Sequence, residues 1–352
     1  MPHSIHLSVS IPESMRGRRL DQALAELVPD YSRSRLQQWI RAGQVVLDDR
    51  VPKTRDIVQG GEQVRIDAEI AMQSPCEAQA IPLDVVYADA DVLVINKPPG
   101  LVVHPAAGNP DRTLQNALLH HDPELAALPR AGIVHRLDKD TSGLMMVARN
   151  LAAHNRLVAA LQAREIRREY LAVVNSVLTA GGEVDAPIGR HPVDRKRMAV
   201  VAGGKPARTH YRVVERFRAH TLVRLRLESG RTHQIRVHMA HIHCPVTGDP
   251  VYGGRLRQPR GAGESLRSVL QGFRRQALHA ERLAFLHPGS GEPVSWEAPV
   301  PPDMQELIDA LREDAGQTAG DACTVPKTRL AGTGSGACLH HHTGRRGQCR
   351  RL

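Results

Sequence analysis

The segment His135-Arg136-Leu137-Asp138-Lys139-Asp140-Thr141-Ser142-Gly143-Leu144 is the most informative stretch of this 352-residue chain. Apolar runs lie on both sides of it, at 132–134 and 144–148. Short apolar runs bounded by turn residues are typical of buried strands. We therefore expect the segment to be a loop between two strands, and catalytic groups are often displayed on loops of that kind.

The loop carries a carboxylate, Asp138, with the cations Arg136 and Lys139 close to it in sequence. Neighbouring cations favour the ionised form of a carboxyl group. An ionised carboxylate is better suited to act as a nucleophile than as an acid. Taken alone, the same residues could also be a charged turn whose side chains only bridge to each other.

A second interpretation of the loop is a base-removing glycosidase that uses both Asp138 and Asp140. On an extended segment, side chains two residues apart point the same way, about 6.6 Å apart, and this separation lies within the range of inverting glycosidases. Both carboxylates have cations nearby, however, and neither has an evident apolar pocket that would make it a general acid. The sequence therefore disfavours this interpretation.

The formal net charge of +10 indicates a polyanionic partner. Half of it comes from residues 316–352, which carry six Lys or Arg residues and one Asp and show no apolar periodicity, so we expect a disordered basic tail. The tail also holds His340 to His342 with Cys338 and Cys349, but this spacing fits no compact zinc unit. We therefore predict no metal.

The cysteines and the lengths of the apolar runs indicate the cellular compartment of the protein. The five cysteines are scattered and odd in number, as in proteins of reducing compartments. No run approaches the roughly 18 apolar residues that a membrane span needs. We expect a cytoplasmic protein, a monomer, with no membrane contact. The chain has neither a Walker loop nor a dinucleotide fingerprint, and we predict no cofactor.

Residues 16–70 are predicted to form a small N-terminal α/β module. Leucines at helical spacing indicate a first helix, 35–42 a second one that ends at Gly43, and 45–51 a strand, a turn and a strand. Arg33, Arg35 and Arg41 lie at or near the second helix, although residues 1–70 carry no net charge. They could contact RNA phosphates, or they could form a solvated basic face.

After a linker at 71–82, a central domain is expected over 83–310. Strands are predicted at 92–95, 101–105 and 170–174, and a helix at 151–162. Residues 223–227 alternate between apolar and charged, which predicts a half-exposed strand. A turn at Ser229-Gly230 follows, and then a helix that Thr232 can cap. Arg231 lies at this junction, where a side chain is more often displayed than packed.

Several blocks together resemble the family of large-subunit ribosomal RNA pseudouridine synthases. The matching segments follow the family's order over about residues 16–310: Asn96-Lys97-Pro98, His135-Arg136-Leu137-Asp138, Gly204-Lys205-Pro206, Gly230 to Arg236, Gly248 to Gly253 and Gln276 to Ala280. Agreement of several blocks is far more specific than one motif. The combination is most similar to the D-type branch, and the N-terminal module resembles the RNA-binding domain named after the fourth small-subunit ribosomal protein.

The resemblance implies an α+β fold with a mixed, mainly antiparallel sheet and an RNA cleft across it. It implies isomerisation of uridine to pseudouridine in 23S ribosomal RNA, on a stem-loop or in a pre-ribosomal particle. Asp138 would be the nucleophile, Tyr170 would pack against the base, Arg231 would pair with the aspartate, and Arg136 would fill the gap left when the base leaves its stack.

Two other functions remain as alternatives. A non-catalytic RNA-binding ribosome factor explains the N-terminal module but not the blocks around Asp138, Tyr170 and Arg231. A metal hydrolase could use the histidines between 233 and 243, but no His-Glu-x-x-His pattern accompanies them. The family resemblance accounts for more of the chain than either alternative.

Overall fold

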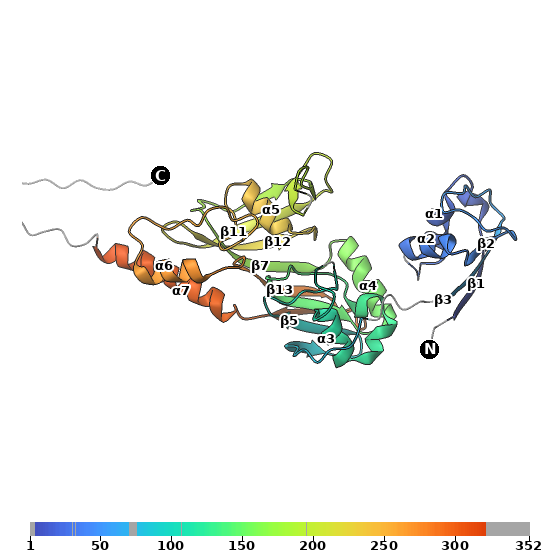
Figure 1. The fold of residues 1–352 in the computed structure, drawn as a ribbon, viewed down its shortest axis with the longest axis horizontal. Coiled ribbons are helices and arrows are strands. Elements are labelled where there is room, and N and C mark those ends of the chain that lie inside the picture. Colours follow the sequence, from blue (N-terminus) through green and yellow to red (C-terminus); the bar gives the residue numbers. More distant parts are fainter. Residues whose placement is uncertain are drawn as a thin grey trace, which may run out of the picture.

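The computed structural model describes residues 4–29, 31, 33–69, 76–106, 108–194 and 196–321 (Figure 1). The N-terminal module contains β1 (Ser4–Ser10), η1 (Glu13–Met15), α1 (Leu20–Leu27), α2 (Arg33–Arg41), β2 (Val45–Leu47) and β3 (Gln63–Glu69). Its sheet has the order β1-β3-β2, and β1 pairs with β3 along its whole length. The module therefore begins before residue 16, because the predicted boundary omits a strand of its sheet.

The module has a core of its own. Leu20 and Leu24 from α1, Leu36 and Trp39 from α2, and Val64 from β3 are buried together. The turn at 48–49 places both aspartates at positive φ, a conformation that Asp tolerates better than most residues. Beyond it only a single bridge joins Leu47 to Arg50, so the second strand predicted at Val51 is absent from the described module.

The central domain is built on a nine-stranded sheet with the order β4-β5-β6-β13-β7-β12-β11-β8 and β14 paired to β13. Its strands are β4 (Val85–Ala88), β5 (Val92–Lys97), β6 (Ser142–Ala148), β7 (Arg167–Val174), β8 (Gly182–Asp185), β11 (Arg208–Arg216), β12 (Thr221–Leu227), β13 (Leu278–Leu286) and β14 (Pro293–Glu297). The β6–β13 pair is parallel and the other pairs are antiparallel. The predicted α+β fold with a mixed, mainly antiparallel sheet is confirmed.

Helices and a small hairpin complete the domain. They are α3 (Leu114–His121), η2 (Pro123–Ala127), η3 (Pro129–Gly132), α4 (Leu151–Gln162), α5 (Gln234–His241), α6 (Glu264–Gly272) and α7 (Pro302–Asp321), with a hairpin of β9 (Ile188–Arg190) and β10 (Met198–Val200). Figure 1 shows α6 and α7 side by side at one end of the sheet. None of the described helices is long and apolar enough to cross a bilayer.

Helix α7 corrects one predicted boundary. Residues 316–321 belong to this helix, so the disordered tail predicted from residue 316 is wrong for these six residues. Met304, Leu307, Ile308 and Leu311 recur at helical spacing and are buried in the main core, which explains why the helix forms. Residues 322–352, with the histidine and cysteine cluster, lie outside the described part of the chain.

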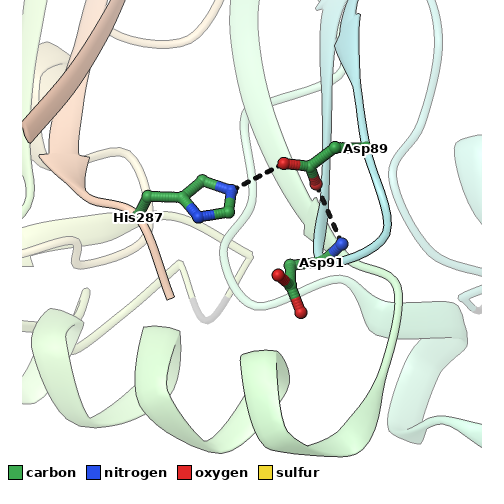
Figure 2. A group of neighbouring side chains, drawn as sticks. All are labelled: Asp89, Asp91 and His287. Carbon is green, nitrogen blue, oxygen red and sulfur yellow. Dashed lines mark hydrogen bonds and ion pairs between the residues drawn. The ribbon is translucent and has the colours of Figure 1, made fainter. Parts of the chain in front are cut away.

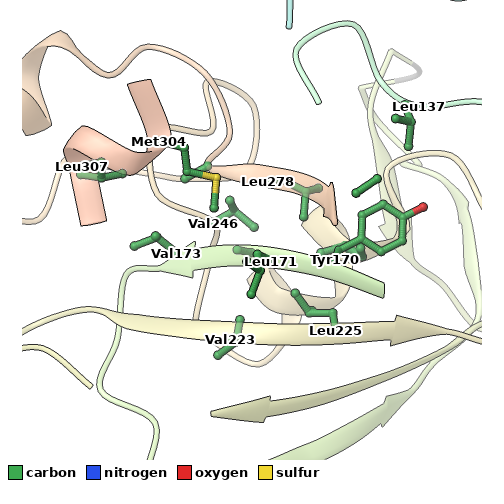
Figure 3. Close-up of a cluster of buried hydrophobic side chains, with 14 of the residues drawn as sticks. Leu137, Tyr170, Leu171, Val173, Val223, Leu225, Val246, Leu278, Met304 and Leu307 are labelled. Atoms are coloured by element: carbon green, nitrogen blue, oxygen red, sulfur yellow. The ribbon is translucent and has the colours of Figure 1, made fainter. Parts of the chain in front are cut away.

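The largest cluster of buried side chains lies around β7, β12 and β13 and reaches helix α7 (Figure 3). Val173, Leu171 and Tyr170 follow one another along β7. Tyr170 lies toward one end of this cluster, and its hydroxyl points away from the labelled side chains of β7, β12 and α7, toward the side on which Leu137 lies. The core therefore holds the tyrosine ring at its margin.

Two predicted strands are wrong. The run 132–134 begins at the last residue of the short helix η3, where Arg130, Ala131 and Gly132 all have positive φ, a conformation that strands do not adopt. Residues 101–105 form only one bridge, between Val102 and Thr113. An apolar run marks burial in both places, but its backbone geometry is set by the neighbouring turns.

Candidate active site

Two glycines allow the loop from 133 to 141 to lie close to the sheet. Gly143 in β6 has φ +114°, and a Cβ there would collide with the backbone of Ala280 on the parallel strand β13. Gly132 has φ +76°, and a Cβ there would collide with the carbonyl oxygen of Ala148. Only glycine permits both approaches, so each end of the loop is anchored by close backbone contact.

Lys97 at the end of β5 fastens one side of the loop. Its Nζ donates to the carbonyl oxygens of Pro98 (2.7 Å), Leu101 (2.9 Å) and Lys139 (2.9 Å). The side chain is 1 % exposed, and burial lowers its pKa to about 7. Three acceptors match the three donors of an ammonium group, so Lys97 ties the turn after β5 to the residue next to Asp138.

Strand β13 and the segment before it fasten the other side. Gln276 donates to the hydroxyl of Thr141 (3.0 Å), His279 and Ser142 share a hydrogen bond (3.0 Å), and Arg275 donates to the carbonyl oxygen of Asp140 (3.2 Å). Residues 139 and 140 form a turn. The extended geometry that would place Asp138 and Asp140 on one face is therefore absent.

The Asp138 carboxylate accepts a hydrogen bond from Arg236. Arg236 Nη1 lies 3.0 Å from Asp138 Oδ2, while Nε and Nη2 of the same guanidinium bind Asp249 at 2.7 and 2.9 Å. The side chain of Asp249 is 0 % exposed, that of Arg236 5 % and that of Asp138 16 %. The two-point contact with Asp249 fixes the plane of the guanidinium and directs its remaining edge at Asp138.

The charges in this cluster support one another. Burial opposes the charge on Arg236, but the hydrogen bond and charge of Asp249, together with Asp138, raise its pKa. Burial likewise opposes the charge on Asp249, and its bonds to Arg236 nevertheless lower its pKa. Arg236 thus stays cationic beside Asp138, with a second carboxylate behind it.

The arginine that pairs with Asp138 is Arg236, so the predicted pairing with Arg231 is wrong. Arg231 precedes helix α5, and its Nε donates to the carbonyl oxygen of Pro206 (3.2 Å). Arg236 is on the buried face of α5 and is 4 % exposed. Asp249 orients Arg236 toward Asp138, whereas the guanidinium of Arg231 is bound by Pro206.

His233 and Tyr252 complete this side of the site. His233 Nε2 lies 3.8 Å from Asp138 Oδ1, and its Nδ1 shares a hydrogen bond with the hydroxyl of Tyr252 (2.9 Å). Burial lowers the pKa of His233. The Tyr252 ring lies under the Arg236 guanidinium at 5.1 Å. His233 is also the N-cap residue of α5, in the left-handed region, so the predicted cap at Thr232 is wrong.

A cleft of about 660 Å³ opens over these groups. Asp138, Tyr170, Arg231 and Arg136 all line it. Tyr170 is 5 % exposed, and burial raises its pKa, which keeps the phenol neutral. Asp140 is not among the lining residues. In the part of the chain that the structure describes, the cleft therefore presents one carboxylate, and this disfavours a glycosidase that needs two.

The three arginines of the N-terminal module are not part of this cleft. They lie on α2, where Arg33 and Arg41 are exposed and Arg35 is half-buried. Arg33 donates to Asp21 at 2.8 and 3.0 Å, and Arg41 donates to Gln37 at 3.3 Å. The module thus carries basic side chains on one helix, and no residue of this helix is among the lining residues of the cleft.

Only Asp89, Asp91 and His287 form a possible metal-ligand group within the described ranges (Figure 2). His287 Nδ1 accepts the backbone N–H groups of Gly289 and Ser290, both at 3.2 Å. Its Nε2 must then carry the ring hydrogen, and it lies 2.8 Å from Asp89 Oδ2. This nitrogen has no lone pair to offer a metal, and the group instead joins the β13–β14 turn to the β4–β5 turn.

Comparison with known proteins identifies the family of this chain. The family described as RNA pseudouridylate synthase matches residues 91–241, and the S4 domain matches residues 18–64. Together with the close relatives below, these matches show that the chain belongs to the RNA pseudouridine synthases, which are isomerases.

Among the relatives is the ribosomal large subunit pseudouridine synthase D of Xanthomonas campestris pv. campestris, 59 % identical over 88 % of this chain and 93 % of that protein. The synthase D of Escherichia coli K12 is 58 % identical over 89 % of this chain and 97 % of its own. A solved structure, human RNA pseudouridylate synthase domain containing 1, has a TM-score of 0.51 at 25 % identity and covers 72 % of this chain and 99 % of that one.

Sequence reasoning missed Lys97, His233, Arg236, Asp249 and Tyr252 as parts of the site. All five lie inside segments that resemble the family, and two features of the sequence could have indicated the pair of Arg236 and Asp249. Arg236 would face the core on an amphipathic helix with Ile235 and Met239, where a charge needs a partner. The acidic residue of the segment 248–253 could supply that partner.

Proposed function

We propose that this enzyme converts specific uridines of 23S ribosomal RNA in the cytoplasm to pseudouridine, with Asp138 as the nucleophile. The reaction breaks the bond between ribose C1′ and base N1 and forms a bond from C1′ to C5. The proton leaves C5 and N1 gains one, so no redox partner or energy carrier is consumed. The single carboxylate of the cleft, held by the Arg236–Asp249 pair, is the observation that carries the assignment.

The remaining groups have supporting roles. Tyr170, neutral and held by the core, provides a flat surface for the base that has left its stack. Unstacking a base costs a few kcal/mol, and Arg136, exposed at the rim of the cleft, offsets part of this cost by filling the vacated position. Arg231 also lines the cleft and contacts the RNA rather than Asp138.

The N-terminal module is assigned to docking. Arg33, Arg35 and Arg41 on α2 bind phosphates of the ribosomal stem-loop or pre-ribosomal particle, and the catalytic domain performs the chemistry. Support comes from the match to the S4 domain and from the two relatives above, whose names specify the large ribosomal subunit.

The decisive experiment is Asp138→Asn, tested on a stem-loop RNA labelled with tritium at C5 of uridine. The change keeps the size and removes the charge, so tritium release should stop while RNA binding and the folded structure persist. Asp140→Asn is the matched control and should retain most activity. Normal turnover by Asp138→Asn would refute the mechanism, and release of free uracil by the wild type would indicate a glycosidase.

A further inference from the structure

Arg168 is a buried cation of the cleft for which the described residues provide no partner. It lies on β7 two positions before Tyr170, and both side chains line the cleft. It is 7 % exposed, and its Nε is buried without a hydrogen-bond acceptor. Across the described chain its guanidinium makes neither a hydrogen bond nor an ion pair.

Acidic residues on β7, and on or next to the strands that pair with it, are already engaged by other arginines. Glu169 accepts from Arg167 (2.8 Å), Glu228 pairs with Arg164 (3.1 Å), and Glu281 accepts from Arg224 (2.8 Å). A buried guanidinium without a counterion is costly. A protein keeps such a group where an anion from outside completes the pairing.

His135 on the same cleft supplies a second unsatisfied donor. Its Nε2 accepts the backbone N–H of Met146 (3.1 Å), so the ring hydrogen lies on Nδ1. Nδ1 is buried and finds no acceptor in the described structure. Burial, followed by the charge of Arg168, lowers the pKa of His135 to about 3, which keeps the ring neutral. Arg168 and His135 thus each have an N–H group without a hydrogen-bond acceptor in the described structure.

The charge of the cleft indicates what that acceptor is. Among the described residues, five arginines and one carboxylate line the cleft, and the carboxylate, Asp138, is already paired with Arg236. The missing acceptor is therefore anionic, and the anion that RNA carries at every nucleotide is a phosphodiester, which a guanidinium can bind through two parallel hydrogen bonds.

We propose that Arg168, with His135, binds the backbone phosphate of the nucleotide that enters the cleft. The proposal rests on the proposed function. Residues two apart on a strand are separated by about 6.6 Å, a distance on the scale of one nucleotide. A base against Tyr170 and a phosphate at Arg168 can therefore belong to the same nucleotide, and this contact would set which residue of the strand reaches Asp138.

The test uses stem-loop RNAs in which single phosphates near the target uridine are replaced by neutral methylphosphonates. For the wild type, one position next to the target should lower kcat/KM by about 10- to 100-fold, as expected for a charge-assisted hydrogen bond. Arg168→Gln should lose a similar factor on unmodified RNA and lose little more when that same phosphate is neutral. At the other positions, the loss in kcat/KM caused by the methylphosphonate and the loss caused by Arg168→Gln should multiply.

Arg226→Gln is the matched control, because Arg226 is an exposed arginine on the adjacent strand β12 and is not among the lining residues of the cleft. It should behave as the wild type on every RNA. Arg168→Lys keeps the charge but not the two-point contact, and it replaces Arg168→Gln in the same comparison if thermal unfolding shows that the glutamine variant does not fold.

Two results would overturn the proposal. In one, no methylphosphonate near the target lowers wild-type kcat/KM. In the other, the loss caused by Arg168→Gln multiplies with every methylphosphonate, as for a residue that only supports the fold. If the wild type makes no pseudouridine in the unmodified stem-loop, the proposed function fails instead. Coupling between Arg168 and one phosphate can still be measured then by equilibrium binding.

Discussion

The catalytic domain and the N-terminal module each contain a buried aspartate that is bound by arginine, but the two arrangements have different consequences. Beneath the cleft Asp249 is 0 % exposed, and its arginine, Arg236, is 5 % exposed. In the module Asp21 is also 0 % exposed, but its arginines, Arg19 and Arg33, are 37 % and 44 % exposed. The first arrangement directs a guanidinium inward at Asp138, and the second presents guanidinium groups to solvent.

The difference in exposure of the arginines corresponds to a difference in proposed role, catalysis for the buried one and RNA docking for the exposed ones. A buried ion pair holds its geometry because the interior gives it no alternative partners, and breaking it leaves an uncompensated charge. An exposed cation is screened by salt and tolerates many geometries, which suits contact with a phosphate backbone. The two regions should therefore respond differently to mutation, acid and salt.

The largest effect is expected at the inward-directed arginine. Arg236→Gln removes the partner of Asp138 and leaves Asp249 buried and unpaired, so we expect kcat/KM to fall by about 100- to 1000-fold. The free energy of unfolding should fall by about 3–5 kcal/mol. Tritium release and urea unfolding measure the two quantities. Arg231→Gln is the control, and a larger loss there would contradict the assigned ion pair.

Lys97→Met tests the attachment of the catalytic loop. The variant keeps the apolar stem and leaves three carbonyl oxygens without their donor, so unfolding should become easier by about 3–5 kcal/mol. Backbone amide hydrogens around residue 139 should then exchange faster with solvent, as mass spectrometry would show. An unchanged unfolding curve would mean that the three hydrogen bonds of Lys97 add no stability.

Acid should weaken the catalytic domain before the module. His220 is 0 % exposed, and burial lowers its pKa to about 4 although Asp314 opposes the shift. The unfolded chain binds this proton near pH 6.5, so stability is lost as the pH falls from about 6.5 to 4, by about 3 kcal/mol in total. His220→Leu should flatten this dependence, which unfolding curves at several pH values would reveal.

Removing residues 1–75, which include the N-terminal module, tests RNA docking separately from the catalytic step. The catalytic core shares no buried residue with the module core, and residues 77 and 79 would remain bonded to α3. Affinity for the stem-loop should fall by about tenfold or more, and the salt slope should flatten by about 0.9 for each phosphate that the shortened protein no longer binds. Activity at saturating RNA should change far less. Unchanged affinity and slope would refute the docking role.

The smallest effect is expected from removing residues 322–352. This segment carries six Lys or Arg residues and no acidic residue, so non-specific RNA binding at low salt should weaken slightly. The modified uridine should stay the same when pseudouridines are mapped by primer extension. A change of target would assign the tail a part in recognition.

Local patterns predicted many of the elements. The helix at 151–162 and the strands β5, β7 and β12 coincide with apolar periodicities, because each buries one face or both against the core. The two false strands show the limit of such patterns. An apolar run reports burial, whereas the backbone of this stretch has positive φ at 130–132 and brings Gly132 close to the carbonyl oxygen of Ala148 in β6.

The sequence by itself determined the fold class, the family and the presence of Asp138, Tyr170 and an arginine-rich segment in one chain. Only the tertiary structure decided that Arg236 rather than Arg231 meets Asp138, that Asp249 orients it, and that Arg168 remains without a partner among the described residues. The physical reason is that periodicity is local, whereas a charge pair depends on side chains as much as 98 positions apart meeting in a buried place.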